Sequence, residues 1–272
     1  MSKIIQSIYK KAMENHARIA LGIDSVTPKL LHSAVKGREF ADVVLVGDSY
    51  AINMIGTELE VIHSKKPAKT LVDMLVSGDV DGAIRGTLSA NSTLSYLKQA
   101  FGLNKLFRVA LLETPDGTPL FLAPVGIDEG ATKEDKLEFI RRVSEHIRRF
   151  DVEPRIAVLS GGRFEDRGRD SYVDKTLDDA EYVTKKAVEE GYDVKHYGIL
   201  IENAVNKANF ILAPDGVSGN LIFRTLVLVA GGYGYGAPVL MEKVFVDTSR
   251  VGGHYTKAIM MASALVRKRQ EY

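Results

Sequence analysis

The chain has 272 residues, and its 36 basic and 35 acidic side chains leave a formal net charge of +1. This balance gives the protein no global field that would attract nucleic acid or an anionic membrane surface, so we expect neither as a partner. The absence of cysteine excludes disulfides, thiolate metal ligands and a cysteine nucleophile.

The first 18 residues are polar with a helical pattern, unlike a signal peptide, and no apolar run approaches the roughly 20 residues that span a bilayer. We therefore expect a cytoplasmic protein. Beyond this segment, short β-rich runs alternate with helical patterns. The expected strands are residues 19–23, 43–46, 59–62, 80–84, 108–112, 120–123, 155–159, 199–201, 210–213 and 239–246.

Among the helical patterns, residues 133–149 are the clearest, because their apolar side chains recur every three to four positions. These side chains are Leu137, Ile140, Val143 and Ile147. Residues 177–190 form another helix, with Gly191 as its expected C-terminal cap. Strands that alternate with helices predict an α/β fold in which mostly parallel sheets are covered by helices on both faces.

One pair of strands breaks this alternation. Residues 109–113 and 120–123 flank a turn-forming segment, residues 114–119, and together predict an antiparallel hairpin. Such a hairpin marks a second subdomain or a dimer arm. We expect two domains, residues 1–104 plus 240–272 and residues 105–239, with the chain crossing between them and no flexible linker.

The most informative segment is the apolar run 210–213, followed by a small polar loop, residues 214–220, and an apolar helical stretch. In an open α/β sheet, free backbone N–H groups and a helix dipole bind anions at such a junction. The loop residues predicted to bind a ligand are Asp215, Ser218, Gly219 and Asn220. The alternative is a pair of ordinary turns, which Asp-Gly and Ser-Gly also form.

Three other segments combine glycine with charged or hydroxyl side chains. In residues 76–87, glycine would let the backbone approach a ligand and arginine would bind phosphate or carboxylate. The candidates there are Ser77, Gly78, Asp79 and Arg85. Alternatively, Asp79 and Asp81 could hold Mg²⁺, or the segment could be a loop with Asx turns.

After the strand 155–159, a glycine pair with nearby arginines fits a ligand crevice, although a charged surface loop is an equal alternative. Ser160, Gly161 and Gly162 are the candidates there. The spacing is not that of a P-loop, and the histidines show no metal-binding spacing. After the last strand, Ser249 could contact a substrate while the Arg250 guanidinium neutralises a developing oxyanion.

In their order along the chain, these segments resemble the phosphate acetyl/butyryltransferase family. The matching motifs are Ser77-Gly78, Pro115-Asp116-Gly117, the Pro-Asp-x-x-[ST]-Gly-Asn loop at residues 214–220, and Ser249-Arg250. The resemblance implies a two-domain α/β/α sandwich of the isopropylmalate dehydrogenase type, with a cleft between domains and a homodimer. It also implies transfer of an acyl group between coenzyme A and phosphate, with Ser249 and Arg250 as the catalytic residues.

Two positions depart from the family pattern. The family places an aspartate seven residues after its serine, and Thr256 stands there in this chain. A family arginine falls on Leu88, with Arg85 as the nearest substitute. Because loss of a general base commonly costs about 10²–10⁴ in rate, we expect slow acyl transfer or none.

A narrower resemblance joins residues 77–86, Tyr233-Gly234 and residues 247–250 to the methanogen marker protein four group, whose members are labelled MtxX, a methyltransferase subunit. This resemblance implies a methyltransferase or corrinoid protein as partner. The sequence itself contains no S-adenosylmethionine loop after its first strand and no corrinoid-binding Asp-x-His-x-x-Gly motif.

Three hypotheses follow. The first is a transferase that binds a small phosphorylated or acyl ligand, such as phosphate or coenzyme A, in the cleft. The second is a non-catalytic partner or regulatory subunit that keeps this cleft for ligand sensing. The third is a divalent-metal site formed by Asp79 and Asp81 with Asp215, which we rank lowest and do not include among the expected cofactors.

Overall fold

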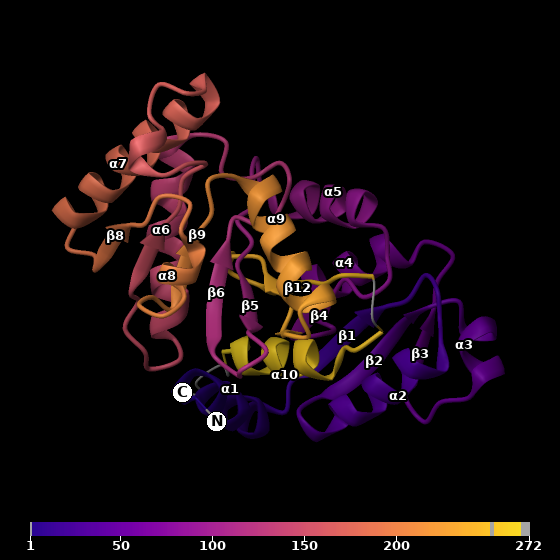
Figure 1. Ribbon diagram of the computed structural model, residues 1–272. Helices are drawn as coiled ribbons and strands as arrows, with labels where there is room; N and C mark the ends of the chain where they lie inside the picture. Colours follow the sequence, from indigo (N-terminus) through magenta and orange to yellow (C-terminus); the bar gives the residue numbers. More distant parts are fainter. Residues whose placement is uncertain (1, 251–252, 268–272) are drawn as a thin grey trace, which may run out of the picture. The chain divides into compact units, whose positions relative to one another are not determined.

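The computed structural model describes residues 2–250 and 253–267 (Figure 1). The chain forms two compact units. The inserted unit comprises Phe107–Gly234 together with the residues up to Ile4, and the terminal unit comprises Ile5–Leu106 and the chain from Tyr235 onward. The chain therefore leaves the terminal unit once and returns to it.

The terminal unit contains a six-stranded sheet in the order β11-β12-β4-β1-β2-β3. All strands are parallel except β11, which is antiparallel to β12. The strands are β1 (Arg18–Gly22), β2 (Asp42–Gly47), β3 (Glu60–His63), β4 (Gly82–Ile84), β11 (Ala237–Pro238) and β12 (Val244–Asp247). The helices are α1 (Lys3–Asn15), α2 (Pro28–Lys36), the 3₁₀ turn Gly37–Glu39, α3 (Ser49–Ile55), α4 (Pro67–Ser77), α5 (Ala90–Phe101) and α10 (Thr256–Leu265).

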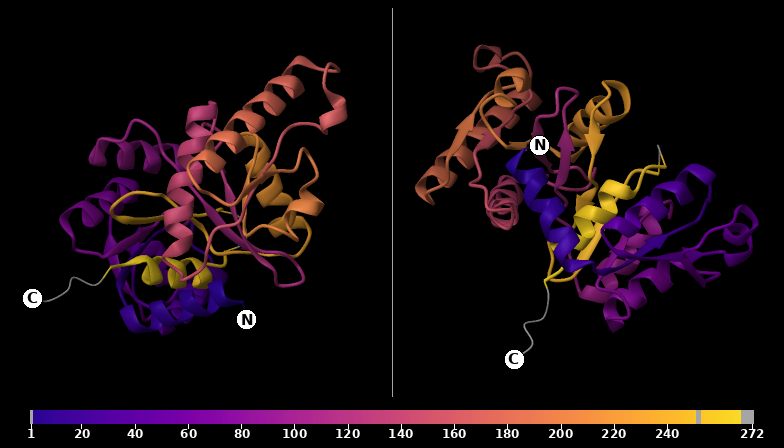
Figure 2. Two further views of the ribbon diagram at one scale, coloured as in Figure 1. Left: turned by 90° about the vertical axis from the view of Figure 1, so that its left-hand side faces the viewer. Right: turned by 90° about the horizontal axis from the view of Figure 1, so that it is seen from below.

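Each face of this sheet has its own apolar core, because successive side chains of a strand point to opposite faces. Ile19 and Leu21 of β1 belong to one buried cluster, which includes side chains of α2 and α10. Ala20 between them belongs to a second cluster, which includes side chains of α4 and α5. Helices therefore cover both faces of the sheet (Figure 2).

The inserted unit contains a second six-stranded sheet in the order β10-β5-β6-β9-β7-β8. Strands β6, β9, β7 and β8 are parallel, while β5 and β10 run antiparallel to their neighbours. The strands are β5 (Ala110–Glu113), β6 (Pro119–Ala123), β7 (Ile156–Val158), β8 (Val194–His196), β9 (Phe210–Leu212) and β10 (Tyr233–Gly234). The helices are α6 (Lys133–Arg148), α7 (Ser171–Glu189), α8 (Ile201–Ala204), α9 (Gly216–Arg224), the 3₁₀ turn Phe164–Asp166 and the π-helical turn Thr225–Val229.

Several elements follow directly from the sequence pattern. The four apolar residues that predicted α6 are all buried. The predicted hairpin is formed by β5 and β6, and Gly117 supplies the positive φ of 84° in its turn. Helix α7 ends as expected before Gly191, but it begins at Ser171 because Asp170 accepts backbone hydrogen bonds there from Tyr172 and Val173.

Two predicted strands are wrong. Residues 199–201 lead into α8, and the strand of that region is β8, whose residues Val194-Lys195-His196 lack the apolar run that would reveal it. Residues 239–246 do not form one strand, because the chain reverses between β11 and β12. The polar pair Glu242-Lys243 occupies that reversal, and only residues 244–246 of the predicted strand pair with β4.

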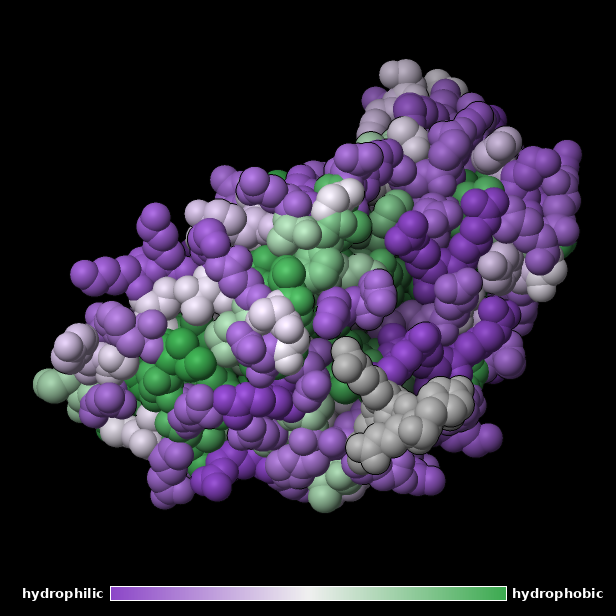
Figure 3. Space-filling view, turned by 180° about the vertical axis from the view of Figure 1, so that it is seen from behind, coloured by the Kyte–Doolittle hydropathy of each residue, from purple (hydrophilic) through white to green (hydrophobic). Residues whose placement is uncertain are grey.

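The α/β class and the mostly parallel sheets are therefore confirmed. The face of the molecule drawn in Figure 3 is mainly hydrophilic, with hydrophobic residues gathered in separate areas. No helix in the described part of the chain has the length and apolar character that crossing a bilayer requires.

Candidate functional site

In an open parallel sheet, ligands bind beyond the carboxyl ends of the strands. In the terminal unit, β12, β4 and β1 are neighbours and run in the same direction. The residues at and beyond their carboxyl ends, 247–250, 85–88 and 23–27, therefore meet at one edge of the sheet. We call this region the terminal carboxyl edge.

A cavity of about 290 Å³ lies at the terminal carboxyl edge. Its lining combines two cationic side chains with three hydroxyl groups. The lining residues are Ser25, Thr27, Lys29, Leu30, Thr87, Arg250 and Gly253. Thr27 caps α2, since its side chain accepts a hydrogen bond of 3.2 Å from the Leu30 N–H. The Leu30 N–H of this first turn is thus already bonded, and Lys29 and Arg250 supply the positive charge that is available to an anion.

A further basic side chain lies close to this cavity. The pKa of His254 is lowered, first by burial and then by the charges of Lys29 and Lys36. A proton on His254 is disfavoured by these lysines because the positive charges repel one another. The surroundings of α2 are therefore electropositive, which favours a negatively charged ligand.

Buried Thr87 holds one wall of the cavity in place. Its Oγ1 accepts hydrogen bonds from the backbone N–H groups of Asp24, at 2.8 Å, and Ser25, at 3.1 Å. The same hydroxyl lies 3.1 Å from the Ser25 carbonyl, to which it donates. The segment after β1 is fixed by a side chain that follows β4.

Arg85, a predicted ligand contact, is buried and fully engaged within the protein. Its Nε forms an ion pair with Asp247, its Nη1 donates to the Leu88 carbonyl at 2.6 Å, and its Nη2 donates to the Thr248 carbonyl. These bonds tie the ends of β4 and β12 together. Arg85 thereby shapes the terminal carboxyl edge, while its predicted contact with a ligand stays a prediction.

Ser249 and Arg250, the predicted catalytic pair, follow β12 directly. Arg250 lines the cavity and is exposed, whereas Ser249 is half-buried. The Ser249 carbonyl accepts a hydrogen bond of 3.4 Å from the hydroxyl of Tyr255, a residue whose backbone N–H donates to Ser33 Oγ. These contacts connect the segment after β12 to the start of α10.

The two positions that depart from the acyltransferase pattern have structural roles. Thr256, the first residue of α10, donates a hydrogen bond of 2.8 Å to the Ser33 carbonyl. Leu88 is only 2% exposed and belongs to the core beneath the sheet. Neither a carboxylate nor a guanidinium occupies these positions.

The structure separates Ser77, Gly78 and Asp79 from Arg85. Helix α4 ends at Ser77, Gly78 caps it with a φ of 84°, and β4 begins only at Gly82. The three residues therefore lie at the amino end of β4, whereas Arg85 follows its carboxyl end. Ser77 Oγ donates to Asp79 at 2.8 Å, and their predicted ligand contacts stay predictions.

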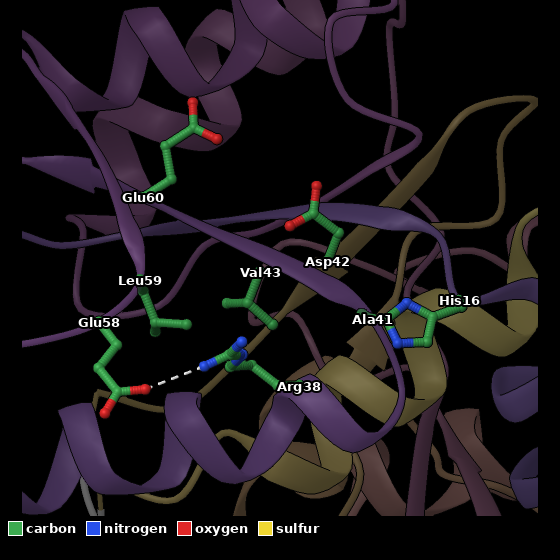
Figure 4. Close-up of a pocket in the computed structure, with 8 residues that line it drawn as sticks. All are labelled: His16, Arg38, Ala41, Asp42, Val43, Glu58, Leu59 and Glu60. Carbon is green, nitrogen blue, oxygen red and sulfur yellow. Dashed lines mark hydrogen bonds and ion pairs between the residues drawn. The ribbon is translucent and has the colours of Figure 1, made fainter.

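A second cavity, of about 250 Å³, lies near the amino ends of β2 and β3 (Figure 4). His16, Arg38, Ala41, Asp42, Val43, Glu58, Leu59 and Glu60 line it. Figure 4 shows Arg38 directed at Glu58, with which it pairs at 3.1 Å. Arg18 pairs with Asp42 and Glu60 at 2.5 and 2.7 Å, so the acidic side chains of this cavity already have cationic partners.

In the inserted unit, the predicted residues follow two neighbouring parallel strands. Ser160, Gly161 and Gly162 come after β7, and Asp215 comes after β9. The predicted loop at residues 214–220 is shorter than expected, because α9 already begins at Gly216 and its first turns contain Ser218, Gly219 and Asn220. The strand, short loop and helix start themselves are as predicted.

The start of α9 is occupied by the protein's own carboxylate. Asp215 accepts a 2.7 Å hydrogen bond from the Ser218 N–H, and the Tyr172 hydroxyl donates to the same side chain. Burial would raise the Asp215 pKa, but these hydrogen bonds outweigh it and lower the pKa. The bond to Asp215 also raises the pKa of Tyr172 to about 12.

The glycines of α9 are required for packing. A Cβ on Gly216 would lie 1.6 Å from the Gly126 carbonyl oxygen, and one on Gly219 would lie 1.9 Å from that of Pro124. Asn220 donates a hydrogen bond of 2.9 Å to the Val125 carbonyl. The motif that suggests ligand binding in sequence thus joins α9 to residues 124–126.

Sequence reasoning missed the partner of Ser160. His196, in β8, places Nε2 at 3.0 Å from Ser160 Oγ, and Ser160 is 1% exposed. Burial lowers the pKa of His196, whose Nδ1 is buried with no hydrogen-bond partner among the residues described. The pair fixes the backbone that leads into Gly161, whose N–H donates to Thr176 at 2.8 Å.

Within residues 2–250 and 253–267, no group of three histidine, aspartate or glutamate side chains could hold a metal ion. Asp81 accepts a hydrogen bond of 2.8 Å from the Arg18 N–H, which gives its carboxylate a structural partner. The sequence analysis did not identify Thr87 as a residue of the cavity, and it also missed the residues around the start of α2, which are Ser25, Thr27 and Lys29. Thr27-Pro28 after a strand is a helix-start signal that could have identified them.

No known protein-family profile matches the sequence. A protein of Methanosarcina mazei named "Putative methyltransferase mtx subunit X" is 57% identical over 274 residues, which cover 100% of this chain and 98% of that protein.

Among solved structures, a branched-chain phosphotransacylase from Enterococcus faecalis superposes with a TM-score of 0.69 at 18% identity, covering 90% of this chain and 98% of its own. A phosphotransacetylase from Streptococcus pyogenes also has a TM-score of 0.69, at 17% identity, with 97% and 98% covered. This chain therefore has the same fold as these two enzymes.

Proposed function

Since the chain belongs to the methyltransferase mtx subunit X family and has a phosphotransacetylase-like fold, we propose that it is a transferase-type subunit that binds a phosphate-containing ligand. The ligand class is phosphate, an acyl phosphate or coenzyme A. The binding site is the cavity at the terminal carboxyl edge. Ser249 and Arg250 are the residues that would contact the reacting group of the ligand.

One observation carries this proposal. Lys29 and Arg250 line one cavity together with the hydroxyl groups of Ser25, Thr27 and Thr87 at the first turn of α2. Cationic side chains supply counter-charge to a phosphate, and the hydroxyl groups of Ser25 and Thr27 can donate hydrogen bonds to its oxygens. The hydroxyl of Thr87 already donates to the Ser25 carbonyl and shapes the wall of the cavity. The position beyond the carboxyl ends of β1 and β4 is where parallel sheets bind such ligands.

The chemistry available at this site follows from its side chains. Arg250 would neutralise the charge that develops on a phosphate or carbonyl oxygen, and Ser249 would contact the reacting group. A thiol or hydroxyl nucleophile needs a base, yet position 256 carries a threonine hydroxyl engaged with the Ser33 carbonyl. Acyl transfer at this site is therefore slow or absent.

The second candidate function is a non-catalytic or regulatory subunit of a methyltransferase system. The Thr256 hydrogen bond favours it, because it shows a structural side chain at the position of the expected base. The relative's name, subunit X, supports assembly with other polypeptides. The partner would be a methyltransferase or a corrinoid protein. Two copies of this chain would form a homodimer, and that homodimer would bind the partner.

A thermal-shift screen of the purified protein tests the ligand proposal. The ligands are phosphate, acetyl phosphate, coenzyme A, acetyl-CoA, S-adenosylmethionine, Mg²⁺, Mn²⁺ and Zn²⁺. A ligand present at 100 times its Kd adds about 2.7 kcal/mol to the free energy of unfolding, which raises Tm visibly. We expect stabilisation by the phosphate-containing ligands only.

Variants then locate the site. Arg250→Ala and Lys29→Ala should abolish the phosphate-dependent rise in Tm, whereas Lys207→Ala, which removes an exposed lysine of the inserted unit, should keep it. If no ligand raises Tm, or if Arg250→Ala responds like the wild type, the cavity is not the ligand site. The partner hypothesis would then be tested by a pull-down with methyltransferase and corrinoid proteins.

A further inference from the structure

A half-buried serine and an exposed histidine are paired at the carboxyl ends of β2 and β3, in the same sheet as the terminal carboxyl edge. Ser49 follows β2, and His63 ends β3, where it pairs in register with Gly47. Ser49 Oγ lies 3.0 Å from His63 Nδ1, and the Ser49 backbone N–H donates to the same nitrogen at 3.3 Å. An amide can only donate, so Nδ1 is the unprotonated acceptor and the Ser49 hydroxyl also donates to it.

Two neighbours hold this imidazole in place. The Tyr50 ring packs edge-on against it, with 5.7 Å between ring centroids and an interplanar angle of 78°. Asp48 Oδ1 lies 3.9 Å from Nδ1, so its carboxylate faces the charge that appears when the imidazole takes up a proton. A hydroxyl bonded to an imidazole is the pair that activates a serine, and the nearby carboxylate would stabilise the protonated imidazole through its charge.

The pair is accessible and has an apolar border. The His63 side chain is 43% exposed. Tyr50 and Met54 lie one turn apart on α3 and are 78% and 87% exposed, which is unusual for side chains of this size. An acyl chain could cover these side chains while its carbonyl carbon reaches Ser49.

We propose that Ser49 is a nucleophile that accepts an acyl group from an activated donor, a thioester, acyl phosphate or aryl ester, with His63 as its general base. In this step Ser49 Oγ forms a bond to the carbonyl carbon, and the bond from that carbon to the leaving group breaks. The Ser49 proton moves to His63 Nδ1, and the leaving group departs with the electron pair of the broken bond. The leaving group then takes up the proton from His63, which returns the imidazole to its neutral form. The products are an O-acyl serine and the free thiol, phosphate or phenol.

The chain contains its own control. Asp170-Ser171-Tyr172 repeats the tripeptide Asp48-Ser49-Tyr50, and in both cases the aspartate caps a helix and the serine is its first residue. Ser171 is exposed, and no histidine bonds to it within the described residues. Local sequence and helix position are therefore matched. Ser49 has the imidazole and is half-buried, whereas Ser171 is exposed, so exposure alone would favour acetylation of Ser171.

The test uses p-nitrophenyl acetate, a donor without phosphate, so its outcome is independent of the proposed ligand site. The full-length protein is incubated with the ester, and acetylation of each serine is followed by peptide mass spectrometry. We expect Ser49 to acetylate faster than Ser171 by about 10²-fold or more, the lower range for general-base catalysis. Equal rates at the two serines would overturn the proposal.

Variants distinguish the effect of a general base on the rate of Ser49 acetylation from the effect of solvent exposure. His63→Gln should slow acetylation of Ser49 to the rate of Ser171, and Ser49→Ala should remove that adduct without changing the rate at Ser171. An unchanged Ser49 rate in His63→Gln contradicts a general-base role. The comparison of the two serines within the wild type requires no variant, so it decides the proposal even if a substitution prevents folding.

Discussion

The guanidinium of Arg85 and the carboxylate of Asp247 form a buried ion pair that joins the carboxyl ends of β4 and β12. Their side chains are 7% and 11% exposed. The two residues are 162 positions apart in the sequence. Asp247 ends β12, and Arg85 directly follows β4, the neighbouring strand of the same sheet. The terminal carboxyl edge thus depends on a charge pair that solvent hardly reaches.

We predict that Asp247→Asn destabilises the protein by about 3–5 kcal/mol, because it leaves the Arg85 charge buried without its counter-ion. Urea denaturation of variant and wild type measures the loss. The double variant Arg85→Met with Asp247→Leu removes both charges and should recover much of the lost stability. A loss below about 1 kcal/mol in Asp247→Asn would show that the pair contributes little.

Gly216→Ala should destabilise the protein by about 3 kcal/mol, the upper end of the usual range for overpacking. The new Cβ would lie 1.6 Å from the Gly126 carbonyl oxygen, which is a backbone atom and cannot rotate away. Val217→Ala is the matched control, since that side chain is 52% exposed and its loss should change stability by about 0.5 kcal/mol or less. Similar Tm values for the two variants would contradict this account of the motif.

Acid should destabilise the protein through His146. Burial, followed by the charge of Arg149, lowers the His146 pKa to about 3, against an ordinary value of 6.5. As pH falls below 6.5, His146 binds a proton in the unfolded chain before it does so in the folded protein. The contribution of neutral His146 to the free energy of unfolding is therefore complete above pH 6.5 and is lost progressively towards pH 3. The expected slope is about 1.4 kcal/mol per pH unit.

His146→Phe tests the assignment of this slope. The ring already packs edge-on against Phe121 and Phe150, and its Nε2 has no hydrogen-bond partner in the described part of the chain. The variant should therefore fold and should lose the slope between pH 6.5 and pH 3. Denaturant titrations at several pH values give the comparison, and equal slopes in the two proteins would exclude His146 as the cause.

Thr256→Asp should raise the rate of acyl transfer between acetyl phosphate and coenzyme A by about 10²–10⁴, if the proposed ligand site is correct. The substitution places a carboxylate at the position where the acyltransferase pattern has its base. Thr256→Asn is the control, because it also removes the hydrogen bond to Ser33 but supplies no base. Equal rates for the Asp and Asn variants would argue against the missing base as the reason for slow chemistry.

Local pattern was sufficient to predict much of the fold. The spacing of Leu137, Ile140 and Val143 identifies the buried face of α6, and the turn at Gly117 identifies the hairpin. Strand β8 could not be found this way, because Lys195 and His196 give it no apolar signature. Its strand conformation comes from pairing with β7, which is a tertiary contact.

The candidate site was less predictable than the fold. Arg250 was singled out from sequence, and it lines the cavity. Lys29 and Thr27 were not, because their position beside Arg250 depends on the order of β12, β4 and β1 in the sheet. Arg85 was interpreted as a ligand contact, since nothing near it in sequence reveals that Asp247 engages its guanidinium.

The insertion of residues 107–234 into the terminal unit has a consequence for biosynthesis. The ribosome completes the inserted unit before β12 is made, yet β12 pairs with β4 in the finished sheet. Until then β4 is an edge strand, and its backbone at Gly82–Ile84 has open hydrogen-bonding groups. While the inserted unit folds, the nascent chain therefore exposes one unpaired edge of β4, which could pair with a wrong strand. The synthesis of residues 244–247 removes this risk, because β12 then pairs with that edge.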